Sequence, residues 1–206
     1  MKTFLLATHN HNKAREFREI FATLVPVLGE CRLITFDDLG DVTEVEETGN
    51  TFEENALIKA RAGAGLGYIT VADDSGLAVD ALDGAPGIYS ARYSGGHGDD
   101  SANNRLLLER LNGVTDRSAH YVCAVACAFP DGREFTVRGE CDGVILTEPS
   151  KGTGGFGYDP LFYIPACKRT FAEMTPEEKN AMSHRAVAIR RFAQELPKYI
   201  IKDLSC

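Results

Sequence analysis

Two pairs of adjacent carboxylates are the strongest chemical signals in the sequence. The pair Asp73-Asp74 directly follows the apolar run Tyr68–Ala72, and the pair Glu46-Glu47 precedes a predicted helix. Negative charges brought together near a hydrophobic core repel each other, and a divalent cation relieves that repulsion. Mg²⁺ typically uses one or two carboxylates together with water and substrate phosphates. The pattern therefore predicts a magnesium site, with a solvated Asp-Ser-Gly turn as the alternative for the aspartates.

A polar turn between a predicted strand and a predicted helix offers a place for phosphate. It consists of Thr8, His9, Asn10, His11, Asn12 and Lys13. Free backbone N–H groups and the dipole at the start of a helix attract anions, and a lysine ammonium adds a point charge. The turn lacks the glycines of a P-loop, so helix capping by Asn or His beside a surface lysine is the alternative.

A glycine-rich segment spans residues 151–160. Its glycines at 152, 154 and 157 formally match the dinucleotide-binding pattern, but Pro160 and Pro165 deny them the helix that would bind a pyrophosphate. Four glycines in six residues instead favour a loop whose backbone closely approaches a ligand. Phe156 and Tyr158 could stack on a base there, and a structural loop with a packed Phe is the alternative.

A last polar group lies where one predicted helix ends and the next begins. It contains Lys179, Ser183, His184 and Arg185. Alone, a His-Arg pair at such a junction is typical of a solvated helix face. The group gains meaning only together with the other clusters.

Strands and helices must position these clusters, and the sequence predicts both in alternation. Strands are predicted at residues 2–7, 68–72, 120–129 and 134–146, and helices at 12–24, from 51, at 100–111, from 175 and at 183–196. The strand at 68–72 is expected to end abruptly on Asp73. The two long strands are apolar on neighbouring positions, so we expect central strands that are covered on both faces.

Local signals support these ranges. Thr51 with Glu54 and Thr175 with Glu178 form capping-box patterns, typical of helix starts. The helix at 12–24 is expected to bury an apolar stripe of Phe17, Ile20, Phe21 and Leu24, and the inner face of the helix from 51 to carry Leu57, Ile58 and Ala62. Pro130–Arg133 has the composition of a hairpin turn. Since helices interleave with strands and one hairpin is present, the sequence predicts an α/β fold with a mixed sheet.

The bulk composition predicts one globular domain over residues 1–206, 44% hydrophobic and 25% charged. The net charge of −8 argues against a general nucleic-acid binder, because phosphate backbones favour basic surfaces. The six cysteines form no CxxC pair and no metal-ligand spacing. No apolar run approaches the length of about 18 residues that spans a bilayer, and the amino-terminal stretch is too short for a signal peptide. We therefore expect a cytoplasmic protein without a membrane partner.

The clusters gain specificity in combination. They occur in this order: Thr8-x-Asn10-x-x-Lys13, Glu46-Glu47-Thr48-Gly49-x-Thr51-Phe52-x-Glu54-Asn55-Ala56, Ala72-Asp73-Asp74-Ser75-Gly76-Leu77, Gly84-Ala85-Pro86-Gly87-Ile88-Tyr89-Ser90-Ala91-Arg92, Gly154-Gly155-Phe156-Gly157-Tyr158-Asp159-Pro160 and Ser183-His184-Arg185. The chain strongly resembles the inosine/xanthosine triphosphate pyrophosphatase family over residues 3–195, without a departure at any motif position.

The resemblance implies a fold, an activity and a set of site residues. It implies an α/β fold around a long mixed sheet with flanking helices, two lobes with an active-site cleft between them, and a homodimer. It also implies Mg²⁺-dependent hydrolysis of non-standard purine nucleoside triphosphates (ITP, dITP, XTP) to the monophosphate and pyrophosphate, which cleanses the nucleotide pool. Asp74 would be the proton acceptor, and Glu46 with Asp74 would bind the metal. Substrate would be bound by Thr8, His9, Asn10, His11, Asn12, Lys13, Ser75, Phe156, Gly157, Tyr158, Asp159, Lys179, His184 and Arg185.

Three other functions stay open at this point. A related pyrophosphatase would act on other altered nucleotides, a regulatory module would only bind them, and a phosphatase with an aspartyl nucleophile would release orthophosphate. The clustered carboxylates disfavour the regulatory module, because a mere binder gains little from negative charges near a polyanion. The sequence does not rank ITP, dITP and XTP.

Overall fold

The computed structural model describes residues 2–22, 31–40, 45–96 and 98–200. The strands are β1 (Lys2–Leu6), β2 (Cys31–Thr35), β3 (Ile69–Val79), β4 (Ser118–Ala128), β5 (Glu134–Ile145), β6 (Phe162–Ile164) and β7 (Arg169–Thr170). The helices are α1 (His11–Ala22), α3 (Phe52–Ala64), α4 (Asp100–Arg110), α5 (Pro176–Met182), α6 (His184–Glu195) and α7 (Pro197–Ile200). Within these described ranges, short 3-10 helices cover Asp37–Leu39, Asp80–Leu82, Gly87–Arg92 and Phe171–Glu173.

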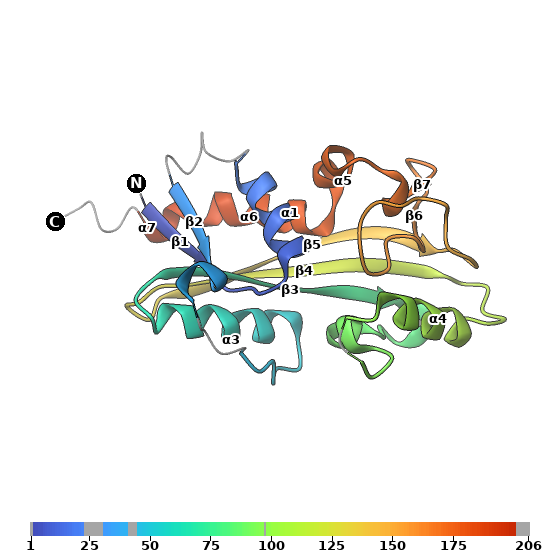
Figure 1. Ribbon diagram of the computed structural model, residues 1–206, viewed down its shortest axis with the longest axis horizontal. Helices are drawn as coiled ribbons and strands as arrows, with labels where there is room; N and C mark the ends of the chain where they lie inside the picture. Colours follow the sequence, from blue (N-terminus) through green and yellow to red (C-terminus); the bar gives the residue numbers. More distant parts are fainter. Residues whose placement is uncertain (1, 23–30, 41–44, 97, 201–206) are drawn as a thin grey trace. The chain divides into compact units, whose positions relative to one another are not determined.

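The seven strands form one sheet in the order β2-β1-β3-β4-β5-β6-β7 (Figure 1). Strand β1 runs parallel to β2 and to β3, with Leu6 opposite Val71 in the second pair. Strands β5, β6 and β7 pair antiparallel. The hairpin between β4 and β5 closes with the Phe129 N–H donating to the Arg133 carbonyl at 2.9 Å. The predicted α/β fold with a long mixed sheet is confirmed.

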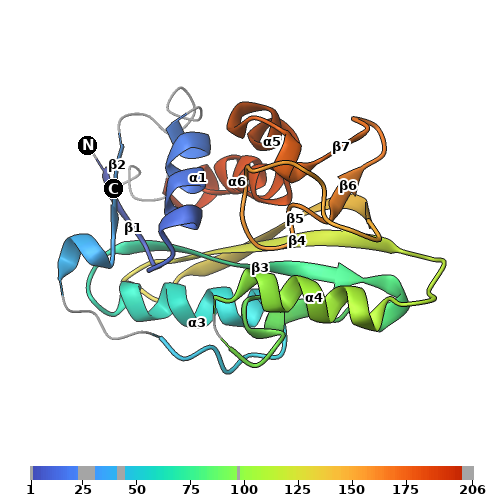
Figure 2. The same cartoon turned by 45° about the vertical axis from the view of Figure 1, so that its right-hand side comes forward.

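The chain divides into two compact units. The first contains the described residues of Met1–Asp74, Cys123–Gly139 and Arg185–Cys206. Within it, α1 and α6 cover one face of the strands and α3 covers the other (Figures 1 and 2). The predicted apolar stripe of α1 is buried, since Phe17, Ile20 and Phe21 belong to the core of this unit together with Phe192 of α6.

The second unit contains Ser75–Val122 and Glu140–His184. Its strands carry α4 on one face and α5 on the other (Figures 1 and 2). Its core is aromatic: Tyr121 lies with its ring centroid 4.5 Å from that of Phe162 and 5.9 Å from that of Phe171. The predicted single domain over residues 1–206, and the cleft between two lobes, stay predictions.

Strand β3 corrects the expectation that it ends before the aspartates. The strand continues through Asp73 and Asp74 to Val79, so the acidic pair lies in its middle. Both carboxylates are buried. The strand can continue because the two side chains find charged and amide partners, which removes the cost of burying them unpaired.

Two further expectations about faces were wrong. In α3 the buried positions are Phe52, Asn55, Ala56, Ala60 and Gly63, whereas Ala62 is exposed and Leu57 and Ile58 are half-buried. Small side chains and the hydrogen-bonded Asn55 form much of the inner face. A search for large apolar residues at helical spacing therefore does not find this face. In β5 one face is largely exposed, with Arg138, Glu140 and Asp142 at alternate positions, whereas β4 is covered on both faces as expected.

The helix starts agree with the capping signals. Thr175 and Glu178 form the predicted capping box of α5. Thr51 accepts a hydrogen bond from the Glu54 N–H, but the Glu54 carboxylate accepts from the Asn50 N–H, so that box is shifted by one residue. Across the described part of the chain, no helix combines the length and apolar character needed to traverse a bilayer. The predicted helix end at Leu24 lies outside the described residues.

Candidate functional site

Asp73 is the centre of a buried charge network in the first unit. Its Oδ2 lies 3.2 Å from Arg185 Nη2 and 3.4 Å from Lys13 Nζ. Burial opposes its ionisation, but the positive charges of Lys13 and Arg185 outweigh burial and hold the pKa of Asp73 well below its usual range. Arg185 also forms an ion pair with Glu16 of α1. Asp73 is therefore a fixed negative charge that holds two cations.

Asp74 meets a different environment one residue later. Its Oδ2 accepts a hydrogen bond from Asn55 Nδ2 at 3.1 Å, and its Oδ1 lies 3.9 Å from Lys59 Nζ. Burial raises the pKa of Asp74, an effect that Lys59 and Lys13 oppose and the charge of Glu47 strengthens. A carboxylate with a raised pKa in a polar surrounding is suited to accept a proton.

The acidic segment before α3 approaches Asp74 through Glu47. Glu47 Oε1 lies 2.5 Å from Lys59 Nζ, whereas Glu46 is exposed. Asn55 links the segment to the strand, because its Oδ1 accepts from the Gly49 N–H at 2.8 Å while its Nδ2 donates to Asp74. Among the described residues, no group of three or more His, Cys, Asp or Glu side chains is arranged to hold a metal ion.

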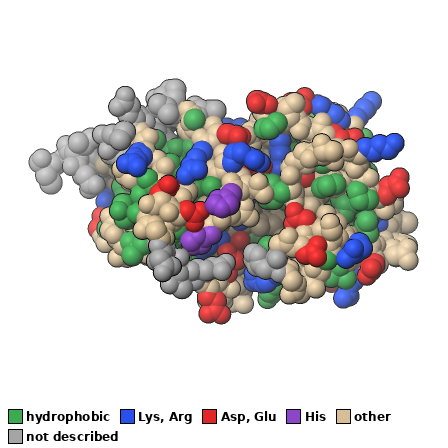
Figure 3. All heavy atoms as spheres, in the orientation of Figure 1, with side chains coloured by type: hydrophobic (Ala, Val, Ile, Leu, Met, Phe, Trp, Pro, Cys, Tyr) green, Lys and Arg blue, Asp and Glu red, His purple; other side chains and the backbone are tan. Residues whose placement is uncertain are grey.

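The polar turn between β1 and α1 caps the helix and carries two histidines. Asn10 Oδ1 accepts from the Lys13 N–H at 3.0 Å, which is N-capping geometry. His9 Nδ1 and His11 Nδ1 lie 2.9 Å and 3.6 Å from the carboxylate of Asp37. Histidine side chains lie beside acidic ones on the face drawn in Figure 3. The capping alternative holds for Asn10, while Lys13 is directed to Asp73 rather than to solvent alone.

Thr8 and Asn12 complete that turn. The Thr8 hydroxyl accepts from the Asn10 N–H at 3.1 Å, so it shapes the turn. Asn12 is exposed in the first turn of α1.

In the second unit, Asp159 organises the glycine-rich loop. Its Oδ2 accepts from the Phe156 N–H at 2.9 Å and from Lys179 Nζ at 2.7 Å. Gly155 lies against it so closely that a Cβ at that position would stand 2.1 Å from Oδ2. Lys179 Nζ lies 4.8 Å from the ring centroid of Phe156, within cation–π range. The loop is irregular, as expected, and its glycine approaches a carboxylate of the loop itself.

Tyr121 connects this loop with the start of α6. Its hydroxyl lies 3.2 Å from Asp159 Oδ1, and its ring stacks on His184 with centroids 4.7 Å apart. Tyr158 is buried, and its hydroxyl donates to the Ser90 carbonyl at 2.9 Å. Ser75 follows Asp74 directly on β3 and is half-buried.

The structure thus assembles the predicted residues in two groups. The first unit brings together Lys13, Asp73, Asp74 and Arg185, and the second unit brings together Phe156, Asp159, Lys179 and His184. Sequence reasoning missed Glu16, Lys59 and Tyr121 as partners of these groups. For Lys59 a signal existed: it lies four residues after Asn55, so both share one face of α3.

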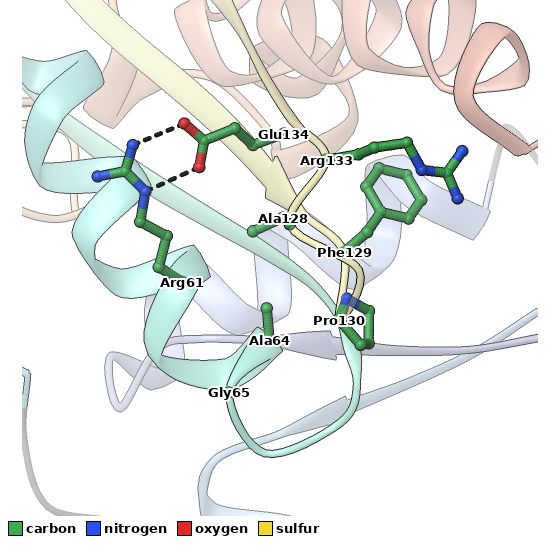
Figure 4. A pocket seen from close by; sticks show the side chains of 9 residues that line it. Arg61, Ala64, Gly65, Ala128, Phe129, Pro130, Arg133 and Glu134 are labelled. Atoms are coloured by element: carbon green, nitrogen blue, oxygen red, sulfur yellow. Dashed lines mark hydrogen bonds and ion pairs between the residues drawn. The ribbon is translucent and has the colours of Figure 1, made fainter.

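A surface pocket of the first unit lies at the carboxyl end of α3 and the β4–β5 turn (Figure 4). Arg61 and Glu134 form a bidentate ion pair across it, with Nε donating to Oε2 at 2.7 Å and Nη2 donating to Oε1 at 2.6 Å. The lining includes none of the predicted site residues. The pocket therefore does not bear on the predicted chemistry.

Known proteins resemble the chain in sequence and in structure. A Ham1 family model matches residues 4–195. A dITP/XTP pyrophosphatase of an Exiguobacterium species is 49% identical over 193 residues, 93% of this chain and 95% of that protein. The protein of the same name in Bacillus anthracis is 45% identical over 208 residues, 98% of this chain and 100% of the relative.

Solved structures agree with this similarity. The structure of the Staphylococcus aureus Ham1 protein superposes with a TM-score of 0.84 at 40% identity, covering 96% of this chain and 100% of that one. A HAM1 protein from Coxiella burnetii gives a TM-score of 0.85 at 39% identity, with the same coverage. Similarity in sequence and in fold extends over nearly the whole length, and the chain belongs to the Ham1 family.

Proposed function

We propose that the chain hydrolyses the non-standard purine nucleoside triphosphates ITP, dITP and XTP to the nucleoside monophosphate and pyrophosphate. The observation that carries this proposal is the contrast between adjacent aspartates. Asp73 is kept ionised by Lys13 and Arg185, whereas burial raises the pKa of Asp74. A poised proton acceptor beside fixed cations suits the hydrolysis of a polyanion. The relatives named dITP/XTP pyrophosphatase suggest the substrate class.

In the proposed reaction, Asp74 accepts a proton from a water molecule whose oxygen bonds to a phosphorus of the triphosphate. The bond from that phosphorus to the leaving pyrophosphate oxygen breaks. Asn55 holds the Asp74 carboxylate through its amide, and Lys13 neutralises the negative charge that develops on pyrophosphate. Such reactions depend on positioning and electrostatic stabilisation more than on covalent catalysis.

Glu46 and Asp74 would hold Mg²⁺ in this proposal. The ion would supply charge neutralisation and polarise the phosphate. Asp74 fits this role, because a second carboxylate, that of Glu47, is close enough to raise its pKa. One or two carboxylates are sufficient, since Mg²⁺ also uses waters and substrate phosphates. Glu47 is the alternative ligand, because its charge acts on Asp74 while Glu46 is exposed.

The remaining predicted residues would bind the nucleotide. The turn from Thr8 to Lys13 would bind the triphosphate. Phe156 would stack on the purine, with Ser75, Gly157, Tyr158, Asp159, Lys179, His184 and Arg185 completing the substrate contacts. Donors directed at a 6-keto oxygen would face the amino group of adenine instead, and an unpaired buried polar group costs about 1–3 kcal/mol.

A product assay tests the activity. The protein is incubated with Mg²⁺ and a panel of ITP, dITP, XTP, ATP and altered pyrimidine nucleotides, and pyrophosphate and orthophosphate are measured separately. We expect pyrophosphate from the keto purines. Orthophosphate would support the aspartyl phosphatase, and retention of ITP without turnover would support a regulatory module.

A magnesium titration tests the metal ligands. Glu46→Gln should raise the Mg²⁺ concentration that gives half-maximal rate, and Glu47→Gln serves as its matched neighbour. If only Glu47→Gln raises this Mg²⁺ concentration, Glu47 and not Glu46 is the metal ligand.

The proposed enzyme is a cytoplasmic homodimer. The dimer rests on the family resemblance, and light scattering at micromolar concentration should give twice the chain mass. A monomer mass would refute it. Cell fractionation checks the compartment.

A further inference from the structure

The backbone of Gly157 is held from both sides by one helix. Its N–H donates to Asp100 Oδ2 at 2.7 Å, and its carbonyl accepts from Asn104 Nδ2 at 3.0 Å. Asp100 and Asn104 both lie on α4, four residues apart, so their side chains project from the same face. Helix α4 therefore forms hydrogen bonds to both the N–H and the carbonyl group of this one loop residue.

Gly157 needs such support because of its conformation. Its φ is +63°, in the left-handed region, although a Cβ at this position would meet nothing within 4 Å. Glycine is therefore required at this position by the backbone conformation and not by a lack of room for a side chain. A loop residue with this φ can readily adopt other backbone angles when nothing holds it, because glycine has access to more of them than any other residue.

The neighbours of Gly157 are fixed elsewhere in the second unit. The Phe156 N–H donates to Asp159, and the Tyr158 hydroxyl donates to the Ser90 carbonyl. The Phe156 ring itself has no such bond and lies half-buried beside Lys179. The peptide that joins Phe156 to Gly157 is therefore the part of the loop that α4 holds.

We propose that Asp100 and Asn104 are positioning residues that hold the Gly157 backbone and thereby pre-orient Phe156 for stacking on the purine. The inference rests on the proposed function, which gives Phe156 its ligand. Asp100 and Asn104 act through Gly157 and do not contact the nucleotide. Their loss releases the loop, and part of the binding free energy is then spent on ordering it.

The two polar atoms of the Asn104 amide have different surroundings, because Nδ2 donates to Gly157 and Oδ1 does not share that bond. Among the residues that the structure describes, its Oδ1 has no hydrogen-bond partner although the atom is buried. Leaving a buried polar atom unpaired destabilises a fold. Replacing Asn104 by alanine removes this unpaired oxygen together with the bond to Gly157, so the two effects on stability oppose each other.

The test compares Asp100→Ala, Asn104→Ala, Asp100→Asn and the control Arg105→Ala in the full chain. Arg105 is exposed on the same helix. Amide exchange at Gly157 is followed by NMR, and kcat and KM for ITP are measured with the melting temperature. Removing one hydrogen bond to a charged acceptor should speed Gly157 exchange in Asp100→Ala about tenfold.

Both alanine variants should raise KM for ITP about fivefold to tenfold with kcat changed less than twofold, because a ligand must then order the loop. Asp100→Asn keeps an acceptor for the Gly157 N–H and should restore most of the protection and of KM. Asn104→Ala should keep a melting temperature close to that of the unaltered chain. Arg105→Ala should match the unaltered chain in every measurement.

Faster Gly157 exchange with an unchanged KM would overturn the inference, as would unchanged exchange. A fall in kcat and melting temperature without a KM effect would assign the two residues to stability alone. If the unaltered chain releases no pyrophosphate, the proposed function fails, and calorimetric affinity for ITP then replaces KM in deciding the positioning role.

Discussion

Asp73 and Asp74 are neighbours on one strand but have opposite electrostatic environments. Burial acts on both carboxyls, yet Lys13 and Arg185 lower the pKa of Asp73, while the pKa of Asp74 is raised. Pairs of acids whose pKa values are driven apart by their surroundings commonly divide the work of a site. Asp73 is therefore expected to hold cations in place, and Asp74 to exchange a proton.

Asp74→Asn should lower kcat for pyrophosphate release at least about 100-fold, because the amide cannot accept the proton. The melting temperature should stay unchanged or rise, since the amide has no charge to bury. The matched control is Asp73→Asn, which removes the carboxylate that Lys13 and Arg185 share, leaves Arg185 paired with Glu16, and should lower the melting temperature. Steady-state kinetics and thermal unfolding check both variants, and a near-normal kcat in Asp74→Asn would remove the proposed base.

Lys13 and Arg185 should differ in what they contribute to selectivity. A residue that contacts only phosphates contributes equally to kcat/KM for ITP and for ATP, because both carry the same triphosphate. A hydrogen-bond donor to the base edge contributes to kcat/KM for ITP alone. Arg185→Ala should lower the ITP-to-ATP ratio of kcat/KM about tenfold, and Lys13→Ala should lower both rates and leave the ratio nearly unchanged.

The buried position of Arg185 adds a second expected effect. Its side chain is 1% exposed and pairs with Glu16 and Asp73. Arg185→Ala removes the buried cation from two buried carboxylates, of which Asp73 keeps Lys13 as a partner, and should cost about 3–5 kcal/mol of unfolding free energy. The ratio is therefore measured below the melting temperature of the variant. An unchanged ratio would move base recognition to the loop from Phe156 to Asp159.

At the scale of elements, the sequence predicted those whose signals are local. Three such signals are confirmed: the apolar stripe of α1, the capping box of α5 and the buried run of β4. Each depends on residues that are close together in the sequence. The continuation of β3 through its aspartates could not be predicted this way. It depends on Lys13 and Arg185, which approach from distant parts of the chain.

The same reason limits prediction of the site. The acidic pairs, the polar turn and the glycine-rich loop were visible as local clusters. Two of their partners were not, because Glu16 and Tyr121 are ordinary residues on a helix or strand until the fold brings them to Arg185 and Asp159. The contrast between Asp73 and Asp74 likewise follows from burial and neighbouring charges, neither of which adjacency in sequence reveals.

An Asp-His-Asp cluster joins three elements of the second unit and predicts a pH-dependent stability. His120 of β4 lies 3.0 Å from Asp142 of β5 and 3.0 Å from Asp80, the first residue of the 3-10 helix after β3. The hydrogen bond to Asp142 raises the pKa of His120, with burial opposing and Asp80 adding to the shift. The stabilisation is thus complete below the unfolded pKa of about 6.5 and is lost as pH rises through the folded pKa.

His120→Gln should therefore lower the unfolding free energy most below about pH 6, by no more than about 1 kcal/mol, because the cluster is partly exposed. The difference should disappear as pH rises through the folded pKa. Denaturant unfolding of both proteins at several pH values measures this difference in unfolding free energy. His11→Gln, a substitution of an exposed histidine in the first unit, is the control. A difference that grows with pH would contradict the assignment.

At the scale of the whole molecule, three strands belong to both units. The boundary between the units falls between Asp74 and Ser75 in β3, between Val122 and Cys123 in β4, and between Gly139 and Glu140 in β5. Each strand therefore continues without interruption from one unit into the other. Two domains joined by linkers would have their boundaries in exposed, irregular segments instead.

This continuity predicts that the chain unfolds as one domain. Unfolding either unit alone would break three continuous strands in their middle. We expect one calorimetric transition, with equal calorimetric and van't Hoff enthalpies for the unfolding unit. Ile189→Ala, in the core of the first unit, and Leu107→Ala, in the core of the second, should shift that single transition without splitting it. Each removes a fully buried side chain and should cost about 2–5 kcal/mol. Two transitions, of which each variant moved only one, would show that the units unfold independently.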